Sequence, residues 1–353
     1  MRLFKPNNGL IGVDITSATV KLLELKPVAD NYHVESYAVR PLREGAVIER
    51  RIQDIDDVAS VLSRAVEHAR PSTHKAAVAL PASAAITKTL HFPVGLSEDE
   101  IEERIVAESD RYIPFPFNEV AFDFQRLGLS PFDQSEQQVL LVACRQHDVT
   151  QLTETLERAG LEPAAVDVET FAMERSFEVL QHQLSVSLDK TTCVGLVDFG
   201  ANMNAFHVMR GGHIVYSRDT VFGGRQLTDA IRERYELSME EAGFAKKRGG
   251  LPEDYQDKVL TPFLETVVQQ VGRSLQLYYT AGRHHEVKEI VLAGGSSVIP
   301  GLAERIAEDS GMRVTIADPF QNMGVNPQLK REALTNDAPA MLTACGLAMR
   351  AGQ

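Results

Sequence analysis

The sequence predicts an α/β protein made of two similar halves, because one short pattern occurs once in each half. Residues 10–25 (LIGVDITSATVKLLEL) and 194–212 (VGLVDFGANMNAFHVMRGG) both place an aspartate at the end of an apolar strand. In both, a turn of small or hydroxyl residues and a second alternating strand follow, which is typical of a hairpin. Two such hairpins can bring Asp14 and Asp198 to opposite sides of one cleft. A third observation is a strand that runs into a glycine-rich turn at residues 289–297 (EIVLAGGSS).

The composition fits a folded protein of more than one domain. The chain has 353 residues, 44% of them hydrophobic and 24% charged. Its net charge of −13 argues against a nucleic-acid partner. The scattered cysteines, Cys144, Cys193 and Cys345, argue against a disulfide framework or a zinc site and fit a reducing cytosol. With no signal-peptide core and no window near the ~20 apolar residues that span a bilayer, we expect a cytoplasmic protein.

The first half begins with strands over residues 10–26 and 31–40. Apolar residues at helical spacing predict a helix over 55–70, which Pro71 ends, and AAVAL predicts a buried strand over 76–80. These elements would form one layered domain around the first hairpin.

Residues 86–147 differ in character and are predicted to be a small inserted α+β subdomain. A strand over 86–92 precedes a capping box, in which Ser97 is followed three residues later by Glu100. A proline-rich turn (IPFPFNE) and two more strands complete the subdomain, and a helix over 148–159 returns the chain to the first domain.

The second half is helical between its hairpin and its last strand. Gly223 and Gly224 precede a helical stretch over 225–247, and a second helical region covers 255–282. We interpret them as a second, all-helical insertion. A helix of small residues over 339–350 closes the chain.

Taken in this order, the pieces resemble the actin/Hsp70/hexokinase ATPase superfamily over nearly the whole chain. The turns after Asp14 and Asp198 resemble its two phosphate loops, and residues 292–300 resemble its adenosine motif, where only glycine lets the backbone approach the nucleotide. Residues 168–172 and 340–348 resemble its two connecting helices. The resemblance implies two RNase H-like domains with Mg-ATP between them.

Within that superfamily the chain resembles the PilM family of type IV pilus assembly, and more distantly the division protein FtsA. The most specific stretch is residues 108–127 (ESDRYIPFPFNEVAFDFQRL). The resemblance implies an actin-like ATPase fold with an FtsA-type α+β insertion in domain 1 and a helical insertion in domain 2. The expected subdomains are 1A (residues 8–85, 148–190 and 338–353), 1C (86–147), 2A (191–225 and 285–337) and 2B (226–284).

The same resemblance implies a partner. PilM proteins bind the N-terminal cytoplasmic peptide of PilN in a groove between subdomains 1A and 1C, beneath PilO and PilP and near the pilus motors. We therefore expect a scaffold of twitching motility, peripheral at the inner membrane through PilN and able to self-associate. FtsA ends in an amphipathic membrane helix, whereas this sequence stops at Gln353, which favours PilM. An FtsA-like filament-forming protein and a small-molecule kinase of the same superfamily stay open as alternatives.

The resemblance assigns candidate site residues. Those expected at the nucleotide are Asp14, Thr16, Ser17, Lys21, Asp198, Gly200, Ala201, Asn202, Lys246, Gly294, Gly295 and Ser296. Asp14 and Asp198 would also hold Mg²⁺, through water, because this hard cation takes oxygen ligands.

Several candidates have a purely structural alternative. Asp14 could cap the local backbone, Asn202 could cap its hairpin, and Lys21 and Lys246 could face solvent. Glu169, at the start of the first connecting helix, could orient the attacking water or could satisfy backbone N–H groups of its own helix. We expect ATP hydrolysis to be slow or absent.

Overall fold

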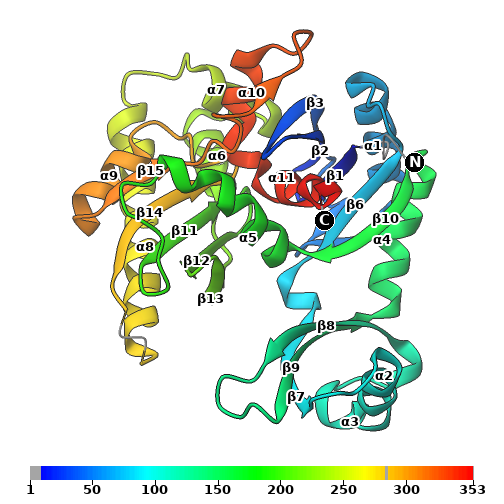
Figure 1. Cartoon of the computed structure of the whole chain (residues 1–353). Helices are drawn as coiled ribbons and strands as arrows, with labels where there is room; N and C mark the ends of the chain where they lie inside the picture. Colours follow the sequence, from blue (N-terminus) through cyan, green and yellow to red (C-terminus); the bar gives the residue numbers. More distant parts are fainter. Residues whose placement is uncertain (1–8, 283–284, 353) are drawn as a thin grey trace.

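The computed structural model describes residues 9–282 and 285–352, and the N-terminal residues to which the signal-peptide prediction refers lie outside the described residues. Two mixed sheets flanked by helices form the body, and a separate three-stranded sheet hangs below it in Figure 1. Within the described part of the chain, no helix is both long and apolar enough to cross a membrane.

The first sheet has the strand order β10-β6-β1-β2-β3-β16. Its strands are β1 (Leu10–Ile15), β2 (Thr19–Val28), β3 (Asn31–Pro41), β6 (Lys75–Leu80), β10 (Glu162–Val168) and β16 (Gly324–Val325). β1 and β2 form the antiparallel hairpin expected from the sequence, and β6 runs parallel to β1. β16 lies within residues 285–337, which the sequence placed in subdomain 2A, yet it pairs with β3. A strand of two residues has no periodicity from which it could be predicted.

The second sheet repeats this arrangement, with the order β13-β12-β11-β14-β15. Its strands are β11 (Cys193–Phe199), β12 (Asn204–Arg210), β13 (His213–Thr220), β14 (Val287–Ala293) and β15 (Arg313–Ile316). β11 and β12 form the second hairpin, and β14 runs parallel to β11 as β6 does to β1. The internal repeat expected from the sequence is therefore present in three dimensions.

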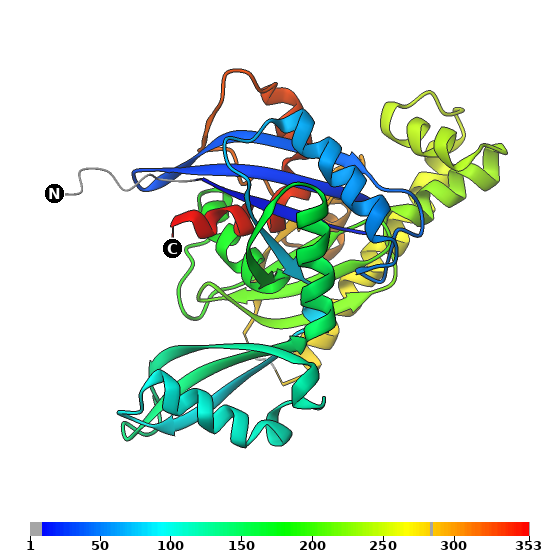
Figure 2. The ribbon, with the colours of Figure 1, turned by 90° about the vertical axis from the view of Figure 1, so that its right-hand side faces the viewer.

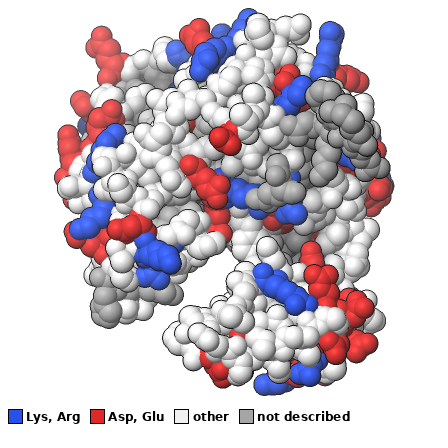
Figure 3. Space-filling model, viewed as in Figure 1, with Lys and Arg blue, Asp and Glu red and all other residues white. Residues whose placement is uncertain are grey.

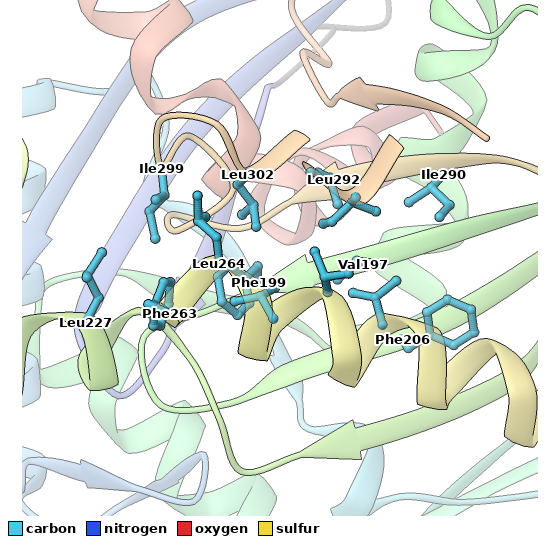
Figure 4. Packing of buried hydrophobic residues seen from close by; sticks show 14 of the residues in the cluster. Val197, Phe199, Phe206, Leu227, Phe263, Leu264, Ile290, Leu292, Ile299 and Leu302 are labelled. Atoms are coloured by element: carbon cyan, nitrogen blue, oxygen red, sulfur yellow. The ribbon is translucent and has the colours of Figure 1, made fainter. Parts of the chain in front are cut away.

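Helices of the second half share one apolar core with this sheet. They are α6 (Gly224–Tyr235), α7 (Met239–Arg248), α8 (Thr261–Thr280, after a π-helical turn at Gln256–Leu260) and α9 (Leu302–Ser310). Figure 4 shows Phe263 and Leu264 of α8 facing Val197 and Phe199 of β11. This apolar layer fixes the position of β11, which carries Asp198 next to its last residue.

Helices α1 (Ile55–Ala69) and α4 (Gln146–Arg158) pack on the first sheet. In Figure 1, α5 (Glu169–Leu180) and α11 (Leu342–Ala348) lie between the two sheets, and α10 (Arg331–Asp337) lies above them at the top of the view. α5 and α11 cross at Ala172 and Gly346. A Cβ atom at Gly346 would lie closer than 3.0 Å to backbone atoms of Ala172. The small residues expected in the second connecting helix are therefore what allows the two helices to touch.

The inserted subdomain is a sheet of order β7-β9-β8 covered by helices on one side, as Figure 2 shows. It consists of β7 (Ile86–Pro93), α2 (Glu98–Ala107), α3 (Ser109–Tyr112), β8 (Val120–Leu129) and β9 (Glu136–Arg145). The capping box expected at Ser97 and Glu100 begins α2. Figure 3 shows an open notch between this subdomain and the part of the body that carries the second sheet and α8.

Candidate functional site

The turns of the two hairpins face each other and are joined by a hydrogen bond. Asn202 Nδ2, in the turn after β11, donates to Ser17 Oγ, in the turn after β1, at 3.0 Å. The carboxylates of Asp14 and Asp198 both act electrostatically on Glu169 at the start of α5. The structure thus brings together three acidic side chains that lie far apart in the sequence.

Asp14 is held by Lys21 rather than by local backbone. Lys21 Nζ lies 2.6 Å from Asp14 Oδ2, and their side chains are 9% and 11% exposed. The pair forms because the two residues are directly opposite in the β1–β2 ladder. The alternative in which Lys21 faces solvent is therefore wrong. Burial raises the pKa of Asp198, while the charges of Arg50 and Lys21 lower it.

Thr16 uses its hydroxyl group to close the first turn. Thr16 Oγ1 accepts from the backbone N–H of Thr19 at 3.1 Å and donates to the Thr19 carbonyl at 3.0 Å. This local bonding gives the turn a fixed shape beside Ser17.

The second turn carries the start of helix α6. The backbone N–H of Gly224 donates to the Gly200 carbonyl at 3.0 Å, and that of Arg225 to the Ala201 carbonyl at 2.8 Å. A Cβ atom at Gly223 would lie closer than 3.0 Å to the Ala201 carbonyl group, so only glycine allows this contact. From the sequence, the glycine pair was placed only as the beginning of a helix, and the structure adds it to the site.

The glycine-rich turn after β14 packs against the same region. Ser296 Oγ donates to the Gly200 carbonyl at 3.0 Å. Gly294 has a φ of 87°, and a Cβ atom there would lie 2.5 Å from Asp198 Oδ1. Gly295 is exposed beside it. The turn therefore forms a wall of the cleft next to Asp198.

Lys246 of α7 reaches the beginning of α6. Its Nζ donates to the Gly224 carbonyl at 2.8 Å and to Thr228 Oγ1 at 2.7 Å. Burial lowers the pKa of Lys246 to about 8, and the neighbouring charge of Lys247 adds to this shift. The alternative of a solvent-exposed helix lysine is therefore wrong.

Glu169 is paired with an arginine that neither sequence interpretation included. Its hydrogen-bond partner is Arg50 Nη1 and not the backbone of α5, so the alternative in which it caps its own helix is wrong. Burial raises the pKa of Glu169 to about 7, although the Arg50 charge lowers it. The carboxylate is therefore held in an ion pair inside the cleft.

Sequence reasoning missed Arg50, which lies in a short hairpin between β4 (Val47–Ile48) and β5 (Arg51–Ile52). Burial alone would lower its pKa, but the charges of Glu169 and Asp198, followed by Asp219 and Asp14, raise it. An arginine in a turn of polar residues gives no signal of this placement, because only the tertiary fold brings the hairpin to the cleft.

These residues fit a magnesium nucleotide. Carboxylates face each other from the two hairpins, glycine turns lie beside them, and cationic side chains accompany them. Among the described residues, no group of three or more His, Cys, Asp or Glu side chains could hold a metal ion. A Mg²⁺ ion here would therefore share its ligands with phosphate and water, which is how proteins usually bind it.

His207, on β12 behind the site, makes a testable prediction about pH. Its side chain is buried and Nδ1 lies 2.8 Å from Ser217 Oγ, while burial, with the Arg50 charge, lowers its pKa to about 4. Between about pH 6.5 and pH 4, His207 is therefore protonated in the unfolded chain but neutral in the folded protein. The free energy of unfolding is unaffected by this group above pH 6.5. It decreases as the pH falls from 6.5 to 4, by about 3 kcal/mol in total.

Urea unfolding at several pH values, for wild type and His207→Gln, measures this contribution. The difference in free energy of unfolding between the two proteins should change by about 3 kcal/mol over that window. His68→Gln, at an exposed histidine, should run parallel to wild type. Parallel curves for His207→Gln would contradict the prediction.

Comparisons with known proteins agree with this geometry. Residues 12–352 match the model of the family described as type IV pilus assembly protein PilM. The fold is similar to that of a PilM-PilN type IV pilus biogenesis complex, with a TM-score of 0.78 and 26% identity over 99% of this chain and 100% of that chain. It is also similar to Ta0583, an archaeal actin homolog in complex with ADP (TM-score 0.52, 10% identity, 98% of this chain and 99% of that chain).

A curated relative matches a part of the chain. Ethanolamine utilization protein EutJ of Escherichia coli (strain K12) is 30% identical over 149 residues, which are 42% of this chain and 46% of that protein. The match thus spans about half the length of that relative. The family model, in contrast, covers almost the whole chain, and the fold is actin-like throughout. The chain belongs to the PilM family of type IV pilus assembly proteins.

Proposed function

We propose that this protein is a cytoplasmic, ATP-binding scaffold of type IV pilus assembly that binds the N-terminal peptide of PilN between subdomains 1A and 1C. Through PilN it would lie at the inner membrane and link PilO and PilP to the pilus motors. The observation that carries the proposal is the 3.0 Å hydrogen bond between Asn202 and Ser17. It makes the two hairpin turns opposite walls of one site.

Mg-ATP is the proposed ligand of this cleft. Its phosphates would contact the turn at Gly200 and Ala201, beside the N-terminus of α6, where the helix dipole favours an anion. Mg²⁺ would bind through water between Asp14 and Asp198 and neutralise phosphate charge. The ADP complex of the archaeal actin homolog supports a nucleotide in this fold.

We propose that turnover is slow. Glu169 is the candidate to orient the attacking water, and a general base must be free to accept a proton from it. Its carboxylate instead accepts a hydrogen bond from Arg50. This arrangement suits a protein that holds nucleotide to stabilise one conformation.

Binding of PilN would then be coupled to nucleotide. A ligand that touches both hairpins favours the closed cleft, so a partner that prefers the closed protein binds more tightly, and the effect is reciprocal. The PilM-PilN complex supports the choice of partner.

The test is a titration of a labelled peptide that copies the N-terminal segment of the cognate PilN, with and without Mg-ATP. We expect saturable binding that scrambling of the peptide abolishes, and affinity at least about 5-fold higher with Mg-ATP. Asp198→Asn should bind the peptide as nucleotide-free wild type does and lose the response to Mg-ATP.

Asp257→Asn is the matched control, because it removes an exposed aspartate in the helical part of the second domain. It should keep both binding and the response. Absence of peptide binding by folded wild-type protein in both states would refute the scaffold proposal. Phosphate transfer to small molecules and ATP-dependent pelleting would then test the kinase and the filament alternatives.

A further inference from the structure

Arg50 occupies a strained position at the tip of the β4–β5 hairpin. Ile48 pairs with Arg51, so Glu49 and Arg50 form a two-residue turn, and their φ angles are 48° and 62°. Turns of this kind favour asparagine and glycine, since other residues adopt positive φ at a cost. Strain of this sort persists where the surrounding structure imposes it, and it is concentrated at functional sites.

The guanidinium group of Arg50 enters the cleft and uses one of its N–H donors in a hydrogen bond. Its side chain is 20% exposed, and Nη1 donates to Glu169 Oε2. Within residues 9–282 and 285–352 this is the only hydrogen bond of its side chain, although a guanidinium carries five N–H donors. Asp198 and Asp219, from the second sheet, also act on its charge. Arg50 therefore belongs to the first domain while it faces charges of the second.

Arg50 and Lys21 are the cations that face these carboxylates, and they differ in how firmly they are held. Lys21 is fixed to Asp14 at 2.6 Å by the pairing of neighbouring strands. Arg50 has a partner on a different element, and its long side chain extends from a turn. An anion that enters the cleft can thus bind the Arg50 side chain without disturbing the pairing of β1 with β2.

We propose that Arg50 senses the terminal phosphate: it binds the γ-phosphate of a nucleoside triphosphate and pairs with Glu169 when that phosphate is absent. The proposal rests on the proposed nucleotide binding and deepens it. The planar guanidinium suits phosphate because it offers two parallel N–H donors. The exchange would let the β4–β5 hairpin, which leads directly to α1, distinguish ATP from ADP.

The test compares the affinities of wild type, Arg50→Ala and Arg51→Ala for ATP and ADP in the presence of Mg²⁺, by isothermal titration calorimetry. Arg50→Ala should weaken ATP about 10- to 100-fold and ADP less than about 3-fold, because one charge-assisted contact is lost. Arg51→Ala removes the same charge from the adjacent, exposed position and should change neither affinity. If Arg50→Ala lowers the affinities for ATP and ADP equally, or lowers neither, Arg50 does not sense the γ-phosphate. Failure of wild type to bind either nucleotide would instead overturn the nucleotide proposal itself.

Glu169→Gln provides a second affinity measurement, which does not require Arg50→Ala to fold. Removal of the negative charge frees Arg50 from its competitor, so ATP should bind about 3- to 10-fold more tightly, with ADP nearly unchanged. The double variant Arg50→Ala/Glu169→Gln leaves no unpaired carboxylate and should lose this gain. If Glu169→Gln weakens ATP as Arg50→Ala does, the ion pair is structural and the sensor is refuted.

Discussion

Replacement of Gly346 by alanine should lower the free energy of unfolding by about 3 kcal/mol or more. The added methyl group would overlap the carbonyl group of Ala172, where α11 crosses α5. Backbone cannot move aside as the end of a flexible side chain can, so the two helices must separate. Because α5 begins at Glu169, the separation would also displace one carboxylate of the site.

Urea unfolding of purified Gly346→Ala, followed by circular dichroism, measures this effect. Gly243→Ala is the matched control: Gly243 lies in α7, and a Cβ atom there would meet nothing within 4 Å. That variant should be neutral or gain about 0.5–1 kcal/mol from its higher helix propensity. Equal stability of the two variants would show that the crossing has room to relax.

Asp167→Asn should cost about 3 kcal/mol of unfolding free energy. Asp167 Oδ2 accepts hydrogen bonds from Arg175 on α5 and from Arg350 after α11, and the Asp167 side chain is only 5% exposed. The variant keeps the shape of the side chain and removes its charge. Two guanidinium groups then share a partly buried site without a counter-ion, which is the situation that makes a broken buried pair expensive.

Thermal or urea unfolding at low and high salt tests this prediction. Glu265→Gln, in an exposed pair with Arg305 at 3.9 Å, is the control and should have little effect because water screens such pairs. The loss in Asp167→Asn should persist at high salt, since a buried pair is screened much less. If the stability loss of Asp167→Asn disappears at high salt, the interactions of Asp167 with Arg175 and Arg350 are screened as surface ion pairs are, and the prediction is wrong.

The two hairpins could be predicted because their pattern is strong and local. Residues 10–25 and 194–212 each contain an apolar strand, an aspartate, small turn residues and a second alternating strand. This order is typical of a β-hairpin and excludes a helix there. The capping box at Ser97 was predictable for the same reason, since its two residues contact each other across one helical turn.

Arg50 and β16 could not be predicted, for two different reasons. The Arg50 turn contains charged residues that usually lie on the surface, and only the packing of two domains surrounds it with carboxylates. β16 is two residues long and its register depends entirely on β3. For Lys21 and Lys246 the position along the element was clear, but their burial depends on packing against Asp14 of β1 and against α6, respectively.

The connection from the inserted subdomain back to the first domain has a mechanical consequence. β9 ends at Arg145 and α4 begins at the next residue, just as β10 ends at Val168 and α5 begins at Glu169. Neither junction contains a flexible residue that could absorb a rotation, and α4 packs along β10. A rotation of the inserted sheet would therefore move α4 with it. Force applied to the far end of the sheet would be transmitted as torque along α4 toward the carboxylate of Glu169.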